Sequence, residues 1–127
     1  MASSLPPKVV ILIVDDEPLI LMHAVDIVEA AGYESVTAAN ADDAILILED
    51  RADIRIVITD VDMPGSMDGL KLAAAIRHRW PPIELIVVSG KHDLSEADLP
   101  IRARFIGKPF DVTRLTMTLH EMAAPGS

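Results

Sequence analysis

The run VVILIV at residues 9–14 constrains the fold of this chain more than any other segment. It predicts a β-strand that is buried on both faces, because a strand with one wet face alternates apolar and polar residues. Such strands are typical of parallel sheets that carry helices on both sides. Apolar runs of the same kind lie at residues 54–60 and 83–90, and a shorter strand is expected within residues 104–110. We expect these segments to lie side by side in one parallel sheet.

The segments between these runs carry apolar residues at helical spacing. We expect one helix over residues 18–31, ended by Gly32, and a second helix with Asn40 as its N-cap. A third helix should end before Pro81, and Asp111 should cap a last helix. The residues expected to face the core are Leu21, Ala24, Val25 and Val28, then Ala44, Ile47 and Leu48, then Leu72, Ala73, Ile76 and Trp80, and finally Val112, Leu115, Leu119 and Met122.

Strand-like and helix-like segments alternate along the whole chain, with a further short strand expected at residues 34–38. This order predicts an α/β fold of the (βα)5 type, a doubly wound parallel sheet of five strands joined by right-handed crossovers. The fourth helix is expected to be shortened. KHDLSEADLP at residues 91–100 offers about one helical turn before its proline.

Length and charge limit the possible functions. The 127 residues suit a single domain, 1–127, with a core at about 8–123. The 20 acidic residues outnumber the 11 basic ones, and a net charge of −9 disfavours direct binding to nucleic acid. No apolar run reaches the roughly 18 residues of a membrane span, and the start lacks the features of a signal peptide, so we expect a cytoplasmic protein without membrane contact.

The predicted strands end in polar residues that share one edge of the sheet, since parallel strands present their carboxyl ends together. These residues are Asp15 and Asp16 after the first strand, Asp60 at the end of the third, Ser89 at the end of the fourth and Lys108 after the fifth. Carboxylates so close together repel one another by about 1–4 kcal/mol per pair, depending on the local dielectric. A hard cation relieves that repulsion, and an all-oxygen site suits Mg²⁺, with Mn²⁺ possible.

Asp60 is the best candidate for a reacting group, because Asp15 and Asp16 stand together as a metal-binding pair. A carboxylate can attack phosphorus to form an acyl phosphate, while the cation and Lys108 neutralise the phosphoryl oxygens. Each of these residues taken alone has an ordinary alternative, such as a solvated acid in a turn or a surface lysine. Those alternatives would have to hold at all four strand ends at once.

Four motifs, VDDEP, ITDVDMPGSMDG, VVSG and FIGKPF, together resemble the receiver domain of bacterial two-component response regulators, in particular the single-domain, chemotaxis-regulator-like type with a flavodoxin-like fold. The resemblance covers about residues 8–123. It implies that Asp60 accepts a phosphoryl group from a sensor histidine kinase or a histidine phosphotransfer protein. It also implies that Asp15, Asp16, Asp60 and the backbone carbonyl of Asp62 hold Mg²⁺.

The same resemblance assigns roles to residues on the last two strands. Ser89 and Phe105 would act as the switch pair, and Lys108 would form a salt bridge to the phosphate. The peptide bond between Lys108 and Pro109 would be cis. The phosphorylated domain would act on a downstream protein target and could form a homodimer. It would not be an enzyme beyond its own phosphorylation and dephosphorylation.

Three features depart from the family pattern. The loop MPGSMDG after Asp60 is one residue longer than usual, and Asp62 adds a fourth acid beside the site. The chain from Ser89 to Lys108 is some three residues shorter than usual, which puts the use of the family's output and dimer face in question.

Two other functions remain open from the sequence. Asp60-Val61-Asp62 imitates the DxD signature of haloacid-dehalogenase-like phosphatases, although that family carries it on the first strand. A degenerate receiver that binds partners without phosphorylation is a second alternative, against which the complete set of acids, hydroxyl and lysine counts. The chain is either a stand-alone receiver or a piece of a longer regulator or hybrid kinase. Leu19-Ile20 is either part of a kinase-docking patch or the first turn of a buried helix.

Overall fold

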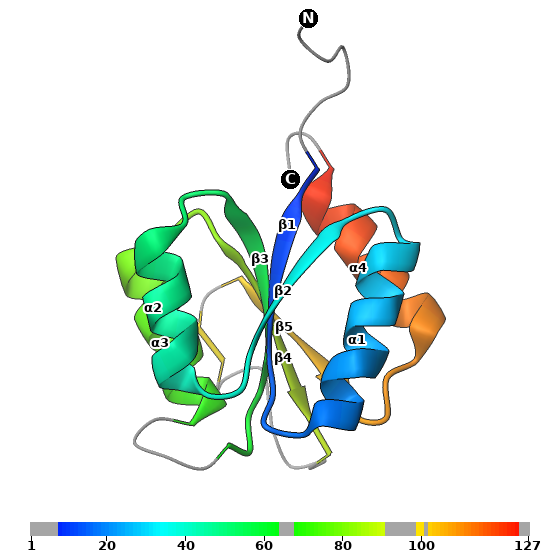
Figure 1. Cartoon of the computed structure of the whole chain (residues 1–127), viewed down its shortest axis with the longest axis horizontal. Helices are drawn as coiled ribbons and strands as arrows, with labels where there is room; N and C mark the ends of the chain where they lie inside the picture. The colour runs from blue at the N-terminus through cyan, green and yellow to red at the C-terminus, as the bar shows by residue number, and fades with distance from the viewer. Residues whose placement is uncertain (1–7, 64–67, 91–98, 101, 125–127) are drawn as a thin grey trace, which may run out of the picture.

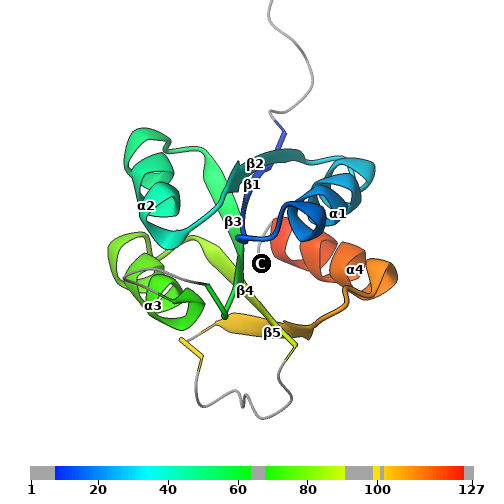
Figure 2. The same ribbon diagram turned by 60° about the horizontal axis from the view of Figure 1, so that its bottom comes forward.

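The computed structural model describes residues 8–63, 68–90, 99–100 and 102–124. Five parallel strands form one sheet in the order β2-β1-β3-β4-β5, with α1 and α4 on one face and α2 and α3 on the other (Figures 1 and 2). The elements are β1 Val10–Val14, α1 Pro18–Ala30, β2 Glu34–Ala38, α2 Ala41–Asp50, β3 Ile54–Asp60, α3 Gly69–Arg79, β4 Glu84–Ser89, β5 Ala103–Gly107 and α4 Val112–Ala123.

The predicted α/β architecture and its parallel five-stranded sheet are confirmed. The short helix expected at residues 91–100 lies almost entirely outside the described residues. The last helix of the chain is therefore α4. One predicted core residue is wrong: Val112 is 51% exposed, whereas Leu115, one turn later, is fully buried. Val112 is the first residue of α4, and the helix reaches the core only from its second turn onward.

The strands explain why the apolar run at residues 9–14 is continuous. Val10, Leu12 and Val14 of β1 face the core layer beneath α2 and α3, whereas Ile11 and Ile13 face the layer beneath α1 and α4. All five residues of β1 are buried, as a strand at the centre of a doubly covered sheet must be. The central strands therefore form a rigid wall between two aliphatic layers, and their ends have fixed positions.

Three helices begin with side-chain caps that fix their starts near the carboxyl edge of the sheet. Asn40 caps α2 and Asp111 caps α4, as predicted, by accepting the backbone N–H groups of Asp43 at 2.8 Å and Arg114 at 3.2 Å. Asp68, which the sequence did not single out, caps α3 in the same way. Among the described helices, none combines the length and apolar character that crossing a membrane requires.

Helix α3 begins in close contact with the end of β3. The backbone N–H of Gly69 donates to the carbonyl oxygen of Val61 at 3.0 Å. A Cβ atom added at Gly69 would lie 1.8 Å from the carbonyl oxygen of Asp60, so only glycine fits there without a backbone shift. This contact ties the start of α3 to the residue that ends the central strand.

We predict that Gly69→Ala destabilises the fold by about 3 kcal/mol, because the added methyl group must push the α3 backbone away from Asp60. Gly90→Ala is the matched control, since a Cβ atom at Gly90 meets nothing within 4 Å. Urea denaturation of both variants measures the difference. Equal stability of the two variants would show that the α3 contact is loose.

Candidate functional site

Five polar residues from four strands meet at the carboxyl edge of the sheet, where the sequence places them. Asp60 and Ser89 are the last residues of β3 and β4, and Lys108 directly follows β5. Asp15 and Asp16 directly follow β1. The edge between β1 and β3 is also the topological switch point, because the chain passes from β1 to β2 on one side and later to β3 on the other.

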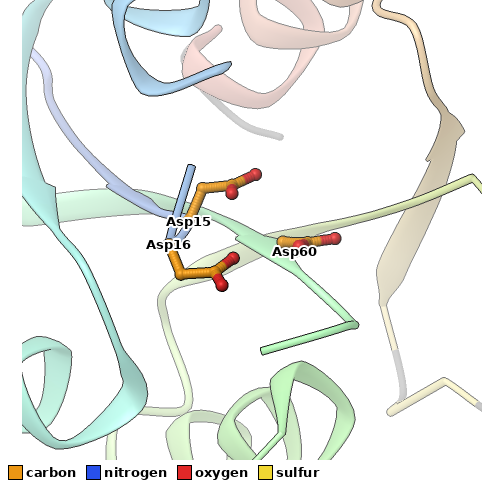
Figure 3. A group of neighbouring side chains, drawn as sticks. All are labelled: Asp15, Asp16 and Asp60. Carbon is orange, nitrogen blue, oxygen red and sulfur yellow. The ribbon is translucent and has the colours of Figure 1, made fainter. Parts of the chain in front are cut away.

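The three carboxylates form one cluster. Asp15, Asp16 and Asp60 each offer an oxygen atom, and these atoms lie within 4.8 Å of one another (Figure 3). Asp15 and Asp60 are buried, whereas Asp16 is exposed. The cluster therefore has two acids held in the protein and a third that reaches solvent.

Lys108 is the cation that faces the two buried acids. Its ammonium nitrogen Nζ lies 3.1 Å from Oδ1 of Asp60 and 3.3 Å from Oδ2 of Asp15. The backbone holds the residue in place, because the N–H of Lys108 donates to the carbonyl oxygen of Ser89 at 3.0 Å. The peptide bond to Pro109 is cis, in agreement with the resemblance.

The environment works against ionisation of Asp60. Burial raises the pKa of Asp60, and the neighbouring Asp15 charge raises it further, while Lys108 and a backbone hydrogen bond from Asp62 act in the opposite direction. Burial alone would lower the pKa of Lys108, but its close pairing with Asp60 and the charges of Asp60 and Asp15 outweigh burial and raise it. The ammonium is thus fixed in its charged form between two carboxylates.

The oxygen atoms at this edge fit a hard divalent cation. Oδ1 of Asp60 is buried and accepts no well-directed hydrogen bond within the described part of the chain, although the ammonium of Lys108 stands 3.1 Å away. Oδ1 of Asp15 accepts the backbone N–H of Glu17 at 2.9 Å, which fixes the rotation of that carboxylate. A buried oxygen with unused acceptor capacity beside two further carboxylates is the donor set that Mg²⁺ prefers.

Ser89, the last residue of β4, is 1% exposed, and Phe105 is partly buried in the neighbouring strand β5. The carbonyl oxygen of Phe105 accepts a hydrogen bond from Arg114 of α4 at 3.2 Å. Asp62 is exposed, and the extra loop residue that follows it lies within the undescribed residues 64–67.

Two residues that support the acids were not singled out from the sequence, Thr59 and Asp68. Together with Gly69 of the MPGSMDG segment they fix the path of the chain on either side of Asp60. The MDG motif hinted at Gly69, because a glycine after a capping aspartate is an unusual start for a helix. Thr59 has no sequence signal beyond being the one hydroxyl in an aliphatic strand.

Fold and site together define the class of the protein: a doubly wound α/β domain with a cluster of three carboxylates and a lysine at its switch point. The strand order β2-β1-β3-β4-β5 is that of the flavodoxin-like fold. Comparison with known proteins agrees, since the family described as the response regulator receiver domain matches residues 11–120. The chain belongs to the response regulator receiver domain family.

Individual relatives carry this domain within longer proteins. The chain is 35% identical over 125 residues to the sensor kinase CckA of Brucella abortus. The aligned region covers 95% of this chain and 13% of CckA. The chain is also 35% identical over 111 residues to the nitrogen assimilation regulatory protein NtrX of Azorhizobium caulinodans. The aligned region covers 84% of this chain and 24% of NtrX. The chain thus spans a quarter or less of the length of these two relatives.

A solved structure supports the fold. The response regulator TrrA of Thermotoga maritima, in complex with Mg²⁺ and BeF, superposes with a TM-score of 0.78 at 28% identity, covering 89% of this chain and 97% of that one. The comparisons give no support to the haloacid-dehalogenase-like alternative, and the Asp60-Val61-Asp62 sequence lies at the end of the third strand, not the first.

We predict that Asp60→Asn stabilises the metal-free protein at neutral pH by about 1 kcal/mol, because burial and the Asp15 charge, which oppose ionisation of Asp60, outweigh its pairing with Lys108. The folded state raises the pKa of Asp60, so the unfolded chain loses this proton at lower pH and stability falls as pH rises through the two pKa values. The advantage of the asparagine should therefore disappear at acidic pH, where Asp60 is protonated.

Chemical denaturation in the presence of a chelator, at neutral and at acidic pH, measures this difference. Asp50→Asn, which replaces an exposed acid at the end of α2, is the matched control and should leave the free energy of unfolding close to that of the wild type. If Asp60→Asn is no more stable than the wild type at neutral pH, the site does not oppose ionisation of Asp60.

Proposed function

We propose that the chain is a phospho-accepting receiver in a two-component phosphorelay and that Asp60 is its phosphoacceptor. The observation that carries this proposal is the position of Lys108, whose ammonium bridges Asp60 and Asp15 at 3.1 and 3.3 Å. A fixed ammonium beside a buried carboxylate is suited to hold a dianionic group attached to that carboxylate. Membership in the receiver family supports the same role.

Asp15, Asp16, Asp60 and the backbone carbonyl of Asp62 would hold Mg²⁺, and Mn²⁺ could replace it in the same oxygen site. When bound, the metal supplies positive charge to the equatorial phosphoryl oxygens. A carboxylate oxygen of Asp60 attacks the phosphorus of a phosphohistidine, the P–N bond breaks, and the imidazole leaves as the acyl phosphate forms. Lys108 keeps its charge throughout and stabilises the transferred group.

The remaining assignments follow from the family and from where the residues lie. Ser89 would donate its hydroxyl proton to a phosphoryl oxygen, and Phe105 would change its side-chain position together with it. The carbonyl oxygen of Phe105 accepts a hydrogen bond from Arg114 of α4, so the backbone of Phe105 contacts the last helix.

The proposed partners are a sensor histidine kinase or histidine phosphotransfer protein and a downstream protein target, with a homodimer as a further possibility. Leu19 is 79% exposed beside the acid cluster, which favours a docking role over burial of the first helical turn. We place the protein in the cytoplasm and assign residues 8–123 as the core of one domain. Its chemistry would be limited to its own phosphorylation and dephosphorylation.

Labelling with a small acyl phosphate tests the function directly. Wild-type protein should gain one phosphoryl group in the presence of Mg²⁺, and chelation of the metal should prevent the gain. Asp60→Asn should abolish labelling, because an amide oxygen is a poor nucleophile and the site loses a metal ligand. Intact-mass spectrometry measures the added group.

Asp50→Asn should label as fast as the wild type, because Asp50 is exposed at the end of α2 and outside the acid cluster. Full labelling of Asp60→Asn would refute the assignment of the acceptor. Rapid turnover of an added phosphoester would instead favour a phosphatase.

A further inference from the structure

Thr59 carries a buried hydroxyl group, and it is the one hydroxyl-bearing residue of strand β3. It is fully buried next to Asp60, and its partners across the sheet are Val14 of β1 and Val87 of β4. Both valines belong to the apolar layer beneath α2 and α3, so a valine at position 59 would pack equally well. Burying a hydroxyl costs free energy unless it is hydrogen-bonded, and a valine would avoid that cost. We therefore expect the hydrogen bond of the Thr59 hydroxyl to have a role beyond packing.

The Thr59 hydroxyl acts on the peptide that leads out of the site. Its Oγ1–H donates to the carbonyl oxygen of Asp60 at 3.1 Å. On the other side of the same peptide unit, the N–H of Val61 donates to the carbonyl oxygen of Val88 at 2.9 Å. Because a peptide unit is planar and rigid, two bonds at opposite ends fix its rotation.

The start of helix α3 is the third group that contacts this part of the backbone, after Thr59 and Val88. Gly69 approaches so closely that an added Cβ atom would lie 1.8 Å from the Asp60 carbonyl oxygen. The N–H of Gly69 also binds the carbonyl oxygen of the next residue, Val61, at 3.0 Å. Thr59, Val88 and Gly69 therefore hold two successive peptide units, and with them the direction in which the chain leaves β3.

That direction decides where Asp62 stands. A backbone hydrogen bond from Asp62 lowers the pKa of the Asp60 carboxyl group, so the Asp62 backbone lies within reach of that side chain. The carbonyl group of Asp62 is the backbone metal ligand in the function proposed above. A small rotation of the Asp60–Val61 peptide would move this carbonyl group relative to the three carboxylates.

We propose that Thr59 is a positioning residue for the metal site: its hydroxyl sets the Asp60–Val61 peptide and thereby the backbone of Asp62 that completes the site. The inference rests on the proposed function, because it presupposes that the acid cluster binds Mg²⁺. It concerns a residue that contacts neither metal nor phosphoryl group and acts through the main chain alone.

Thr59→Val removes the hydroxyl and keeps the shape of the side chain. It should raise the Mg²⁺ dissociation constant about tenfold, as loss of a group that orients metal ligands commonly does. Titration of the whole chain with Mg²⁺, followed by backbone amide NMR shifts, measures the constant. The amide proton of Val61 should also exchange faster with solvent in this variant, while that of Ile58 in the same strand stays protected.

Two further variants separate positioning from stability. Thr59→Ser keeps the hydroxyl and should restore Mg²⁺ binding close to the wild-type level. Thr118→Val is the matched control, because Thr118 is also buried and its hydroxyl donates to the Arg114 carbonyl oxygen at 2.9 Å within α4. It should lose stability without any change in the Mg²⁺ dissociation constant. Thr59→Ala provides the same test if the valine variant does not fold.

The possible outcomes are distinct. Wild-type Mg²⁺ affinity in Thr59→Val or Thr59→Ala, with only a loss of stability, would overturn this inference and leave the proposed function intact. Weaker binding in Thr118→Val as well would overturn it too, because the effect would then be general softening. A wild-type protein that binds no Mg²⁺ would instead contradict the proposed function.

Discussion

The whole edge of this molecule depends on one electrostatic conflict, the closeness of two buried carboxylates. Asp15 and Asp60 are both nearly inaccessible to solvent, and the ammonium of Lys108 lies within 3.3 Å of an oxygen of each. Without that ammonium, two like charges would share a region of low dielectric, where their repulsion costs several kcal/mol. The lysine relieves part of the conflict but leaves Asp60 with a raised pKa. The site is therefore prepared to accept further positive charge.

A conflict of this kind persists only if the backbone is too rigid to relax it. The strands that carry Asp15 and Asp60 are neighbours at the centre of the sheet, with aliphatic layers on both faces. Moving either acid away would require breaking ladder hydrogen bonds or opening the packed core. The apolar strand at residues 9–14 and the acids that follow it thus belong to one arrangement, in which the strand provides the rigidity and the acids provide the charge.

Much of the fold could be predicted from the sequence, because its signals are local. Continuous apolar runs identified the central strands, and Asn40 and Asp111 identified two helix starts. Asp15, Asp16, Asp60, Ser89 and Lys108 could be assigned to one edge, since parallel strands align their carboxyl ends. Val112 was misassigned because helical spacing describes which face a residue occupies but not where along the helix the core begins.

The supporting contacts could not be predicted, since each one joins segments that are distant in sequence or depends on the rotation of a single peptide. The approach of Gly69 to Asp60 requires the path of a whole loop, and the double pairing of Lys108 requires the spacing of three strands. The sequence indicates only that Thr59 is an ordinary strand residue. The structure shows that its hydroxyl donates a hydrogen bond to the Asp60 carbonyl oxygen. These contacts convert a set of polar strand ends into a site of defined geometry.

The proposed function requires that the ends of four strands form one site for a cation and a phosphoryl group. A crystal structure of the chain with Mg²⁺ and beryllofluoride, the combination present in the T. maritima TrrA structure, tests that claim most directly. We expect beryllium on a carboxylate oxygen of Asp60, Mg²⁺ bound by Asp15, Asp16 and Asp60, and the Lys108 ammonium on a fluorine atom. Beryllofluoride on a different acid, or a metal bound away from this cluster, would contradict the account.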